Sequence, residues 1–577
     1  MIRSKIKQKI EHYMEALARK EVFLQAVLVG LLSGGLVVLF KLSIDTTFNY
    51  VEKFSFELPF WARVLILPLI TTLGGLIAGL LIFKIAPEAS GSGIPYIKMA
   101  LTRFGKILRI RSIFVKFFAG VAGLGAGLPM GREGPSVQLG AGAGSVIGSL
   151  FRLNSNDKDK IIAAGAGSAI GATFNAPIAG AIFVLEELIQ RFSSALLFPV
   201  LTATVTAASL SRYFLGNHPS FSIPDLNPDM NGASIIVCIL LGFASGILGV
   251  LFSKLIYLNN DMYAKIHIPN WAKPAFAGFF IGIIGLFVPD VLGTGNSAIS
   301  LLLANELGLS LIAIIFIAKF ILTPFCFGSG TAGGIFLPML MLGAFLGFMM
   351  AIVANNMGYH VNSGVIALVG MAAFMSAVAR TPITAVVIVF EMSAGYNYIL
   401  PIMLSAAIAD LTAGRLHHKP IYTELLIKQT HATKQNQHLS EISAQQIMHP
   451  DITTLQQNIT LSQALKIIKC QKQEAFPVLN SDKKLGGIVT RTALNEALIQ
   501  ENQAGMPIER VMSFYPVTTS PDTDLHAVYV RMQLQNTEFA VVISPQNDIL
   551  GLISLADLHD IADDRLNTKS CPAGNNK

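Results

Sequence analysis

Charged residues are scarce in this sequence. Only 13% of its 577 residues are Asp, Glu, Lys or Arg, whereas 52% are hydrophobic. Because a globular domain ordinarily carries roughly 25% charged residues, this chain has too little charge to cover a soluble surface of its size. The shortage is uneven: no charged residue occurs from Ile335 to Ala379, whereas the chain after Lys419 is much more polar. The composition predicts a membrane protein with a soluble C-terminal part.

Several classes of function lack the residues that they require. The cysteines have no metal-ligand spacing, which disfavours a disulfide framework and predicts no metal site; they are Cys238, Cys326, Cys470 and Cys571. No His-Glu-x-x-His, Gly-x-Ser-x-Gly or phosphate-binding Gly-rich sequence occurs, so the chain is not expected to be an enzyme. The net charge of +7 suits a chain that lies against anionic lipid, and nucleic-acid binding is disfavoured.

Apolar stretches of spanning length recur along the chain. The basic residues that precede the first one predict that residues 1–20 form a cytoplasmic helix; they are Arg3, Lys5, Lys7, Lys9, Arg19 and Lys20. Several later stretches are short for a crossing or are interrupted by Gly and Pro. Backbone freed inside a bilayer must be buried in protein or line an aqueous cavity. This pattern predicts the interior of a multi-pass transporter or channel.

The membrane part contains an internal repeat. Residues about 20–210 and 230–415 are expected to be two copies of one unit, because the same groups recur in order: Lys116, Pro135, Gly165, Pro177 and Glu186 recur as Lys319, Pro338, Gly370, Pro382 and Glu391. The repeat alone leaves parallel and inverted copies open. With both termini in the cytoplasm, an odd number of crossings per copy would force inversion.

A second, smaller repeat follows the membrane part. Met448, Glu474 and residues 487–490 recur as Met512, Glu538 and residues 551–554. Each copy combines a helical pattern with short apolar strands, which predicts two α/β domains at 444–500 and 508–563, preceded by a linker at 426–443. The polar tail at 564–577 is expected to be disordered.

Three Gly-rich segments that precede helices predict an anion site. They are Gly91-Ser92-Gly93-Ile94-Pro95, Gly131-Arg132-Glu133-Gly134-Pro135 and Gly333-Gly334-Ile335-Phe336-Leu337-Pro338. Free N–H groups and the positive dipole end make a helix N-terminus attractive to anions. The alternative is that these segments are only packing breaks. Their number, with two related by the repeat, favours the anion site.

Two groups of glutamates stand in charge-poor surroundings. A Glu133 carboxylate could occupy the anion site itself and leave it when protonated, which would make a gate sensitive to pH. Glu186 and Glu187 point about 100° apart if both are helical, so one could be structural and the other could line the pathway. The alternative is that both lie at an exposed cytoplasmic helix end.

These motifs, with Lys98 and with Tyr422 after Lys419-Pro420, resemble the signature of CLC chloride channels and proton/chloride antiporters. The order and spacing agree from Gly91 to Tyr422. The resemblance implies an all-α polytopic membrane domain over residues 21–425, built from two inverted-topology repeats. It also implies a homodimer in the cell membrane with one pore per subunit and both termini cytoplasmic. The C-terminal repeat is similar to a cytoplasmic tandem pair of CBS domains.

The resemblance also implies roles for individual residues. Chloride would be bound by the hydroxyls of Ser92 and Tyr422 and by the backbone amides of Ile335 and Phe336. Glu133 would be the external gate and would transfer protons. Glu187 would match the internal proton-transfer glutamate that channels of the family lack. The sequence departs from the first motif at Tyr96, where the family usually has Glu, so salt bridging near the inner vestibule is in question.

The resemblance favours proton-coupled chloride antiport, with three alternatives. The first is a passive gated chloride channel, which would have the same pore. The second is a fluoride exporter of the same superfamily, which Ser92 disfavours. The third belongs to another class of function and is a nucleotide sensor whose membrane part is a receptor. In the CBS-like pair, Ser554 and Asp557 match a pattern that binds the ribose of nucleotides, whereas the first copy has Ala493 in place of Asp. Two roles for this pair are equally favoured: it binds an adenine nucleotide, or it only supports dimerisation. No other cofactor is expected.

Overall fold

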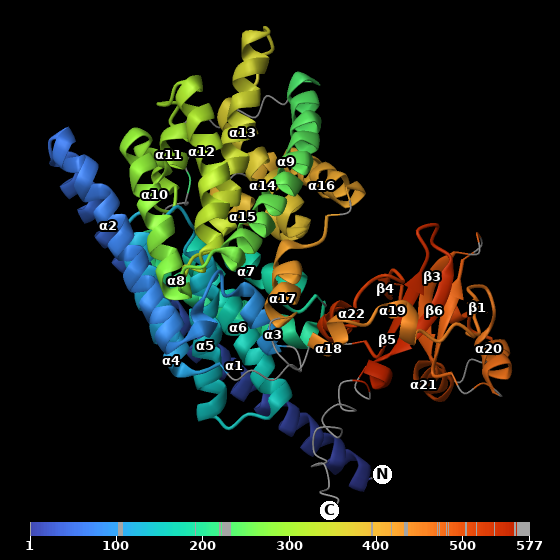
Figure 1. The fold of residues 1–577 in the computed structure, drawn as a ribbon. Coiled ribbons are helices and arrows are strands. Elements are labelled where there is room, and N and C mark those ends of the chain that lie inside the picture. The colour runs from blue at the N-terminus through green and yellow to red at the C-terminus, as the bar shows by residue number, and fades with distance from the viewer. Residues whose placement is uncertain are drawn as a thin grey trace, which may run out of the picture. The chain divides into compact units, whose positions relative to one another are not determined.

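The protein divides into two compact units, with the boundary between Glu424 and Leu425. The structure is a computed structural model (Figure 1) that describes residues 2–101, 108–190, 192–217, 221, 232–393, 396–416, 418–431, 437–469, 471, 473–480, 482, 484–501, 505–514, 516–535, 537–558 and 561. The predicted tail at 564–577 and part of the predicted linker, residues 432–436, lie outside these residues.

The first unit is helical. Its first repeat consists of α1 (Ile2–Glu57), α2 (Phe60–Leu80), α3 (Ile94–Leu101), α4 (Ile110–Gly125), α5 (Glu133–Leu150), α6 (Ser155–Phe174), α7 (Pro177–Phe183) and α8 (Ser194–Leu215). A π-helical turn, η3 (Val184–Leu188), directly continues α7. The expected N-terminal helix at 1–20 is part of α1, which runs without a break into the first apolar span.

The second repeat follows the same order. It consists of α9 (Gly232–Lys265), α10 (Lys273–Phe287), α11 (Asn296–Leu303), α12 (Leu309–Gly328), α13 (Phe336–Asn356), α14 (Ser363–Ala379), α15 (Pro382–Ser393) and α16 (Ile399–Arg415), and α17 (Ile421–His431) follows it. Among the described residues, six helical segments are long and apolar enough to cross a membrane.

Close helix contacts relate the two repeats. In the first, Gly140 of α5 lies against Gly165 of α6, where a Cβ on either glycine would overlap the carbonyl of the other. In the second, Gly343 of α13 and Gly370 of α14 make the same contact. Glycine is required because two backbones meet at these points. The repeat predicted from the sequence is therefore a structural repeat, and its copies have inverted topology.

The second unit contains two copies of one α/β arrangement. One three-stranded sheet has the order β1 (Leu455–Gln456), β2 (Ala475–Leu479), β3 (Leu485–Thr490), and the other has the order β4 (Val517–Thr519), β5 (Phe539–Ile543), β6 (Ile549–Ser554). In both, the first pair is parallel and the second antiparallel. The helices are α18 (Gln437–Ser440), α19 (Ala444–Ile447), α20 (Leu461–Ile468), α21 (Arg491–Glu501) and α22 (Leu525–Leu534). Ala475 and Ile488 of one sheet pack in one buried cluster with Val541 and Leu552 of the other.

Candidate functional site

The N-termini of α5 and α13 meet in the membrane unit. Gly131 and Gly334, which precede these helices, form an isolated antiparallel bridge with N–H to carbonyl distances of 2.7 and 2.6 Å. The two glycines are equivalent in the repeat, so each exchanges hydrogen bonds with its own counterpart. The bridge holds two helix N-termini together, which is the arrangement predicted for an anion site.

The Glu133 carboxylate lies at the N-terminus of α13. Its side chain is buried, and Oε2 accepts a hydrogen bond from the N–H of Leu337 at 3.3 Å. A Cβ on Gly131 would overlap Oε2, so the glycine makes room for the folded-back side chain. Oε1 is buried and has no hydrogen-bond partner among the described residues. The carboxylate thus occupies the position in which the helix terminus could bind a free anion.

Ser92 lies against the first turn of α5. A Cβ on Gly134 would overlap both Ser92 Oγ and the Ser92 carbonyl. The flanking Gly91 and Gly93 have φ values of 67° and 88°, a backbone conformation that glycine adopts without strain. Ser92 Oγ is buried and has no partner within the described part of the chain. A hydroxyl donor therefore lies beside the two helix termini without a protein acceptor.

Tyr422 supplies a second buried hydroxyl. It lies in the first turn of α17, is fully buried, and its OH has no partner among the residues described. Ile335 and Phe336 cap and begin α13, and both are fully buried. The Phe336 ring packs against those of Phe174 and Phe183, at centroid distances of 5.4 and 6.1 Å. Helix α13 is thus anchored on its first residue.

The two adjacent glutamates have different partners. Glu187 is buried, and its Oε1 lies 2.6 Å from Lys98 Nζ. Glu186 instead accepts hydrogen bonds from the N–H groups of Ile383 and Thr384, at 3.1 and 2.6 Å, in the first turn of α15. The divergence expected from helical geometry therefore occurs, with Glu186 as a helix cap and Glu187 in a buried ion pair. The alternative, in which both lie at an exposed helix end, does not describe Glu187.

Two buried lysines support the loops before α3 and α11. Lys116 Nζ donates to the carbonyls of Ala89 and Gly91 at 2.9 and 2.6 Å. Lys319 Nζ does the same for Val291 and Gly293 at 3.0 and 2.8 Å. The two lysines, which are equivalent in the repeat, therefore have the same structural role, since both ammonium groups donate to backbone carbonyls. Through Gly91, Lys116 also fixes the loop that carries Ser92.

Two ion pairs of the site were not predicted from the sequence. Arg132, which precedes Glu133, is buried and lies 2.7 Å from Asp45 of α1. Lys98 pairs with Glu187, although Tyr96, two residues earlier, lacks the charge usual at its position. Salt bridging in this region is thus provided by Lys98. The shortage of charge marked Glu187 as notable, but Lys98 lies 89 residues from it, and Asp45 lies 87 residues from Arg132.

The C-terminal unit brings Ser554 and Asp557 together. Asp557 Oδ2 accepts hydrogen bonds from the Ser554 N–H and Oγ, at 2.9 and 2.6 Å, and lies 3.3 Å from His449 Nε2. Burial alone would raise the pKa of Asp557, but these contacts outweigh it and hold the pKa below its usual range. Among the described residues, the hydrogen bonds to this carboxylate end on Oδ2. Oδ1 could therefore accept a ribose hydroxyl.

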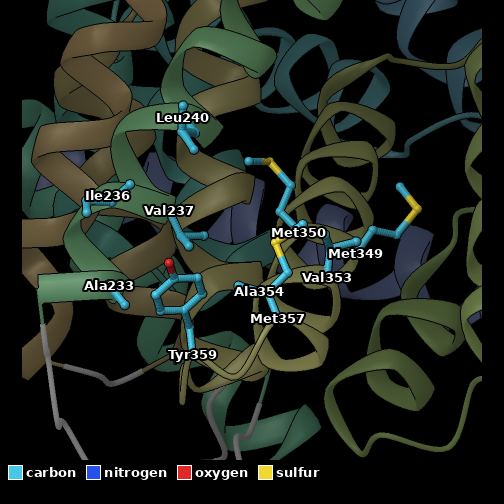
Figure 2. A pocket seen from close by; sticks show the side chains of 10 residues that line it. All are labelled: Ala233, Ile236, Val237, Leu240, Met349, Met350, Val353, Ala354, Met357 and Tyr359. Atoms are coloured by element: carbon cyan, nitrogen blue, oxygen red, sulfur yellow. The ribbon is translucent and has the colours of Figure 1, made fainter.

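An apolar cavity lies apart from these groups. It has a volume of about 470 Å³ and is lined by residues of α9 and of the C-terminal part of α13, with Met357 and Tyr359 (Figure 2). Among the described residues that line it, Tyr359 alone has a polar side-chain group, and none is basic. Within the described ranges, no group of three or more His, Cys, Asp or Glu residues could hold a metal ion.

Comparisons with known proteins match both units. The family model described as "Voltage gated chloride channel" matches residues 74–414, and the one described as "CBS domain" matches residues 444–500. The H(+)/Cl(-) exchange transporter ClcA of Citrobacter koseri is 35% identical over 422 residues, which cover 70% of this chain and 88% of that protein. ClcA of Vibrio cholerae serotype O1 is 34% identical over 435 residues, covering 73% and 91%.

Solved structures share the fold. A slow cyanobacterial Cl⁻/H⁺ antiporter superposes with a TM-score of 0.66 at 30% identity, covering 72% of this chain and 98% of that one. The match to a eukaryotic CLC transporter covers 94% of this chain and 98% of that chain, with a TM-score of 0.65. Because the identity is 19%, this match shows the fold alone. Since the family model matches more than half of the sequence, the chain belongs to the voltage gated chloride channel (CLC) family.

Proposed function

We propose that this protein is a secondary active transporter that exchanges chloride for protons. The observation that carries the proposal is the buried Glu133 carboxylate, hydrogen-bonded at the N-terminus of α13 in the position of an anion. Such a group can compete with chloride while charged and leave when it takes up a proton. A second buried carboxylate, Glu187, is available on the same unit.

The positions of the site residues suggest a separate role for each of them in transport. Chloride would bind to the hydroxyls of Ser92 and Tyr422, which are buried without protein partners, and to the amides of Ile335 and Phe336. A charged Glu133 closes the outer side of this site. A proton removes the attraction between Glu133 and the helix N-terminus, the side chain swings away, and chloride passes. Glu187 would supply the proton from the cytoplasmic side.

The similar proteins support this proposal by their names. The ClcA relatives are H(+)/Cl(-) exchange transporters, and the cyanobacterial structure is a Cl⁻/H⁺ antiporter. These proteins match the membrane unit, in which Glu133 and Glu187 lie.

Paired flux measurements in liposomes test the proposal. We expect an imposed proton gradient to drive chloride uphill, and the reversal potential to shift with pH as well as with chloride. Glu133→Ala should abolish proton movement while chloride still flows. Glu57→Ala is a control, because Glu57 is exposed at the end of α1, where its partner is the exposed Lys53. If chloride flux through the unaltered protein does not depend on the proton gradient, exchange is refuted and the protein is a passive channel.

The same liposomes distinguish the anions. We expect chloride to be exchanged and fluoride to be a poor substrate, because Ser92 and Tyr422 offer neutral hydroxyl donors to a large, weakly hydrated anion. Faster proton-coupled fluoride flux than chloride flux would instead identify a fluoride exporter.

We also propose a homodimer in the cell membrane with both termini cytoplasmic, as the family resemblance implies. Photobleaching of single fluorophores on the reconstituted protein should show two steps for each particle. In sealed right-side-out cells, a protease should cut tags on either end only after the membrane is opened.

For the C-terminal unit, we propose an adenine nucleotide site that includes Ser554 and Asp557. The Ser554 contacts fix the Asp557 carboxylate and leave Oδ1 for a ribose hydroxyl. Titration of the full-length protein with ATP should give saturable binding, and Asp557→Ala should abolish it. Asp548→Ala is the control, because Asp548 is an exposed carboxylate in the loop before β6, and this variant should still bind ATP. Absence of ATP, ADP and AMP binding to the unaltered chain would leave dimerisation as the role of this pair.

A further inference from the structure

One buried ammonium joins three elements of the membrane unit. Lys98 of α3 is fully buried, and its Nζ donates to Glu187 Oε1 of η3 at 2.6 Å and to Thr423 Oγ1 of α17 at 3.0 Å. Thr423 is itself only 8% exposed. The three side chains therefore form a buried cluster in which a single positive charge faces a carboxylate and a hydroxyl.

The same three elements carry the residues assigned to transport. Helix α3 begins directly after the Ser92 loop, η3 carries Glu187, and Thr423 is the neighbour of Tyr422 on α17. Lys98 is thus bonded both to the internal carboxylate and to the helix that presents one of the two anion-binding hydroxyls.

The charge of the Lys98–Glu187 pair depends on one proton. When Glu187 is ionised, its carboxylate is the counter-charge of the Lys98 ammonium, and when Glu187 is protonated, that counter-charge is removed. Among the described residues, Glu186 also acts electrostatically on Glu187, and its carboxylate accepts a hydrogen bond at the N-terminus of α15. The Tyr422 phenol of α17 lies within the electrostatic influence of both Glu187 and Glu133. A buried charge acts over longer distances than an exposed one because little water screens it.

We propose that Lys98 is a positioning residue that makes proton arrival at Glu187 strengthen chloride binding at Ser92 and Tyr422. The proposal rests on the proposed function, in which Glu187 receives the internal proton. Protonation of Glu187 leaves the Lys98 ammonium without its counter-charge, and the uncompensated positive charge attracts the anion. Loss of that proton restores the neutral pair and releases the anion. Proton and chloride therefore bind the inner part of the site with positive linkage.

Chloride titrations of the purified protein at two pH values test this linkage. The measurements use a Glu133→Gln background, in which the gate no longer titrates. In this background, we expect chloride to bind at least tenfold more tightly at pH 5 than at pH 8, because a factor of ten is already the effect of one unit charge roughly 12 Å away at an effective dielectric constant of about 20. Adding Lys98→Arg should preserve this difference, because the charge remains. Adding Lys98→Met should abolish it.

A second variant keeps the test decisive if Lys98→Met does not fold. Glu187→Gln in the same background makes the positive charge permanent, so chloride should bind at pH 8 as tightly as the background protein binds it at pH 5. Weak binding at pH 8 in this variant would overturn the proposal, as would an undiminished pH difference in Lys98→Met. Lys98 would then be only a structural brace.

Different experiments would refute proton/chloride antiport and the role of Lys98. Absence of proton-driven chloride transport by the unaltered protein in liposomes refutes antiport itself. Intact antiport, combined with chloride affinity in Glu133→Gln that does not change with pH, refutes the role of Lys98 alone.

Discussion

Glu186 and Glu391 cap each other's helices. Glu186 lies in the turn that continues α7 and accepts a hydrogen bond from the Thr384 N–H, at the start of α15, at 2.6 Å. Glu391 lies near the end of α15 and accepts a hydrogen bond from the Ala179 N–H, at the start of α7, at 2.7 Å. The two carboxylates occupy equivalent positions in the two repeats. Each places a negative charge at a helix N-terminus, where the helix dipole favours it, and together they lock the repeats to one another.

Neutralising either cap should lower stability without uncoupling transport. We expect Glu391→Gln to reduce the free energy of unfolding by about 1–3 kcal/mol, the typical loss for a hydrogen-bonded charge. Thermal unfolding in detergent measures this loss, and liposome flux measures the ratio of protons to chloride. Glu187→Gln, which changes the residue after the equivalent cap, should instead alter proton coupling. A Glu391→Gln variant that unfolds normally but moves no protons would contradict the structural role.

The contact between Gly134 and Ser92 predicts a sharp effect of one methyl group. In Gly134→Ala, the new Cβ would overlap Ser92 Oγ and the Ser92 carbonyl, so the Ser92 loop must move. Such overpacking costs about 1–3 kcal/mol, and we expect chloride affinity to fall about tenfold or more, which calorimetric titration measures. Gly308→Ala is the matched control, because a Cβ at Gly308 meets no atom within 4 Å. Unchanged chloride affinity in Gly134→Ala would show that chloride does not bind at Ser92.

Local signals in the sequence were sufficient to predict where the key helices begin. A Gly-rich segment with Pro in the first turn marks the starts of α5 and α13, and the repeat identified Lys116 and Lys319 as equivalent. The partners of Lys98 could not be predicted, because Glu187 and Thr423 lie 89 and 325 residues away. Periodicity and capping describe the nearest few residues only. The pairing of a buried charge is decided by how distant helices pack.

The two unpartnered hydroxyls should contribute to chloride binding and not to the stability of the chloride-free protein. Ser92 Oγ and Tyr422 OH are buried without hydrogen bonds among the described residues, so Ser92→Ala and Tyr422→Phe remove no hydrogen bond to the described part of the protein. A ligand that binds the folded state raises its stability by mass action, and we expect both variants to show a smaller rise in unfolding temperature with added chloride.

Tyr263→Phe provides the control for these hydroxyls. Tyr263, on α9, is also buried, its OH also lacks a partner within the described chain, and its ring packs against Phe276 and Phe325. This variant should keep the full stabilisation by chloride. An equal loss in all three variants would show that buried hydroxyls act generally on stability and would remove Ser92 and Tyr422 from the anion site.

The Asp557 carboxylate should stabilise the end of β6 in a manner that depends on pH. Its pKa lies below the usual range because hydrogen bonds from Ser554 and the contact with His449 outweigh the effect of burial. A lowered pKa in the folded state means that the stabilisation is fully present above the ordinary aspartate pKa of about 4 and is lost as the pH falls through the lower folded value. We expect Asp557→Asn to cost about 1 kcal/mol at pH 7 and progressively less below pH about 4. Hydrogen exchange of the β6 amides in the full-length protein measures this difference, with Asp482→Asn in the exposed β2–β3 loop as control. Equal protection of β6 in Asp557→Asn and the unaltered protein at pH 7 would show that the Ser554 contacts do not hold this strand end.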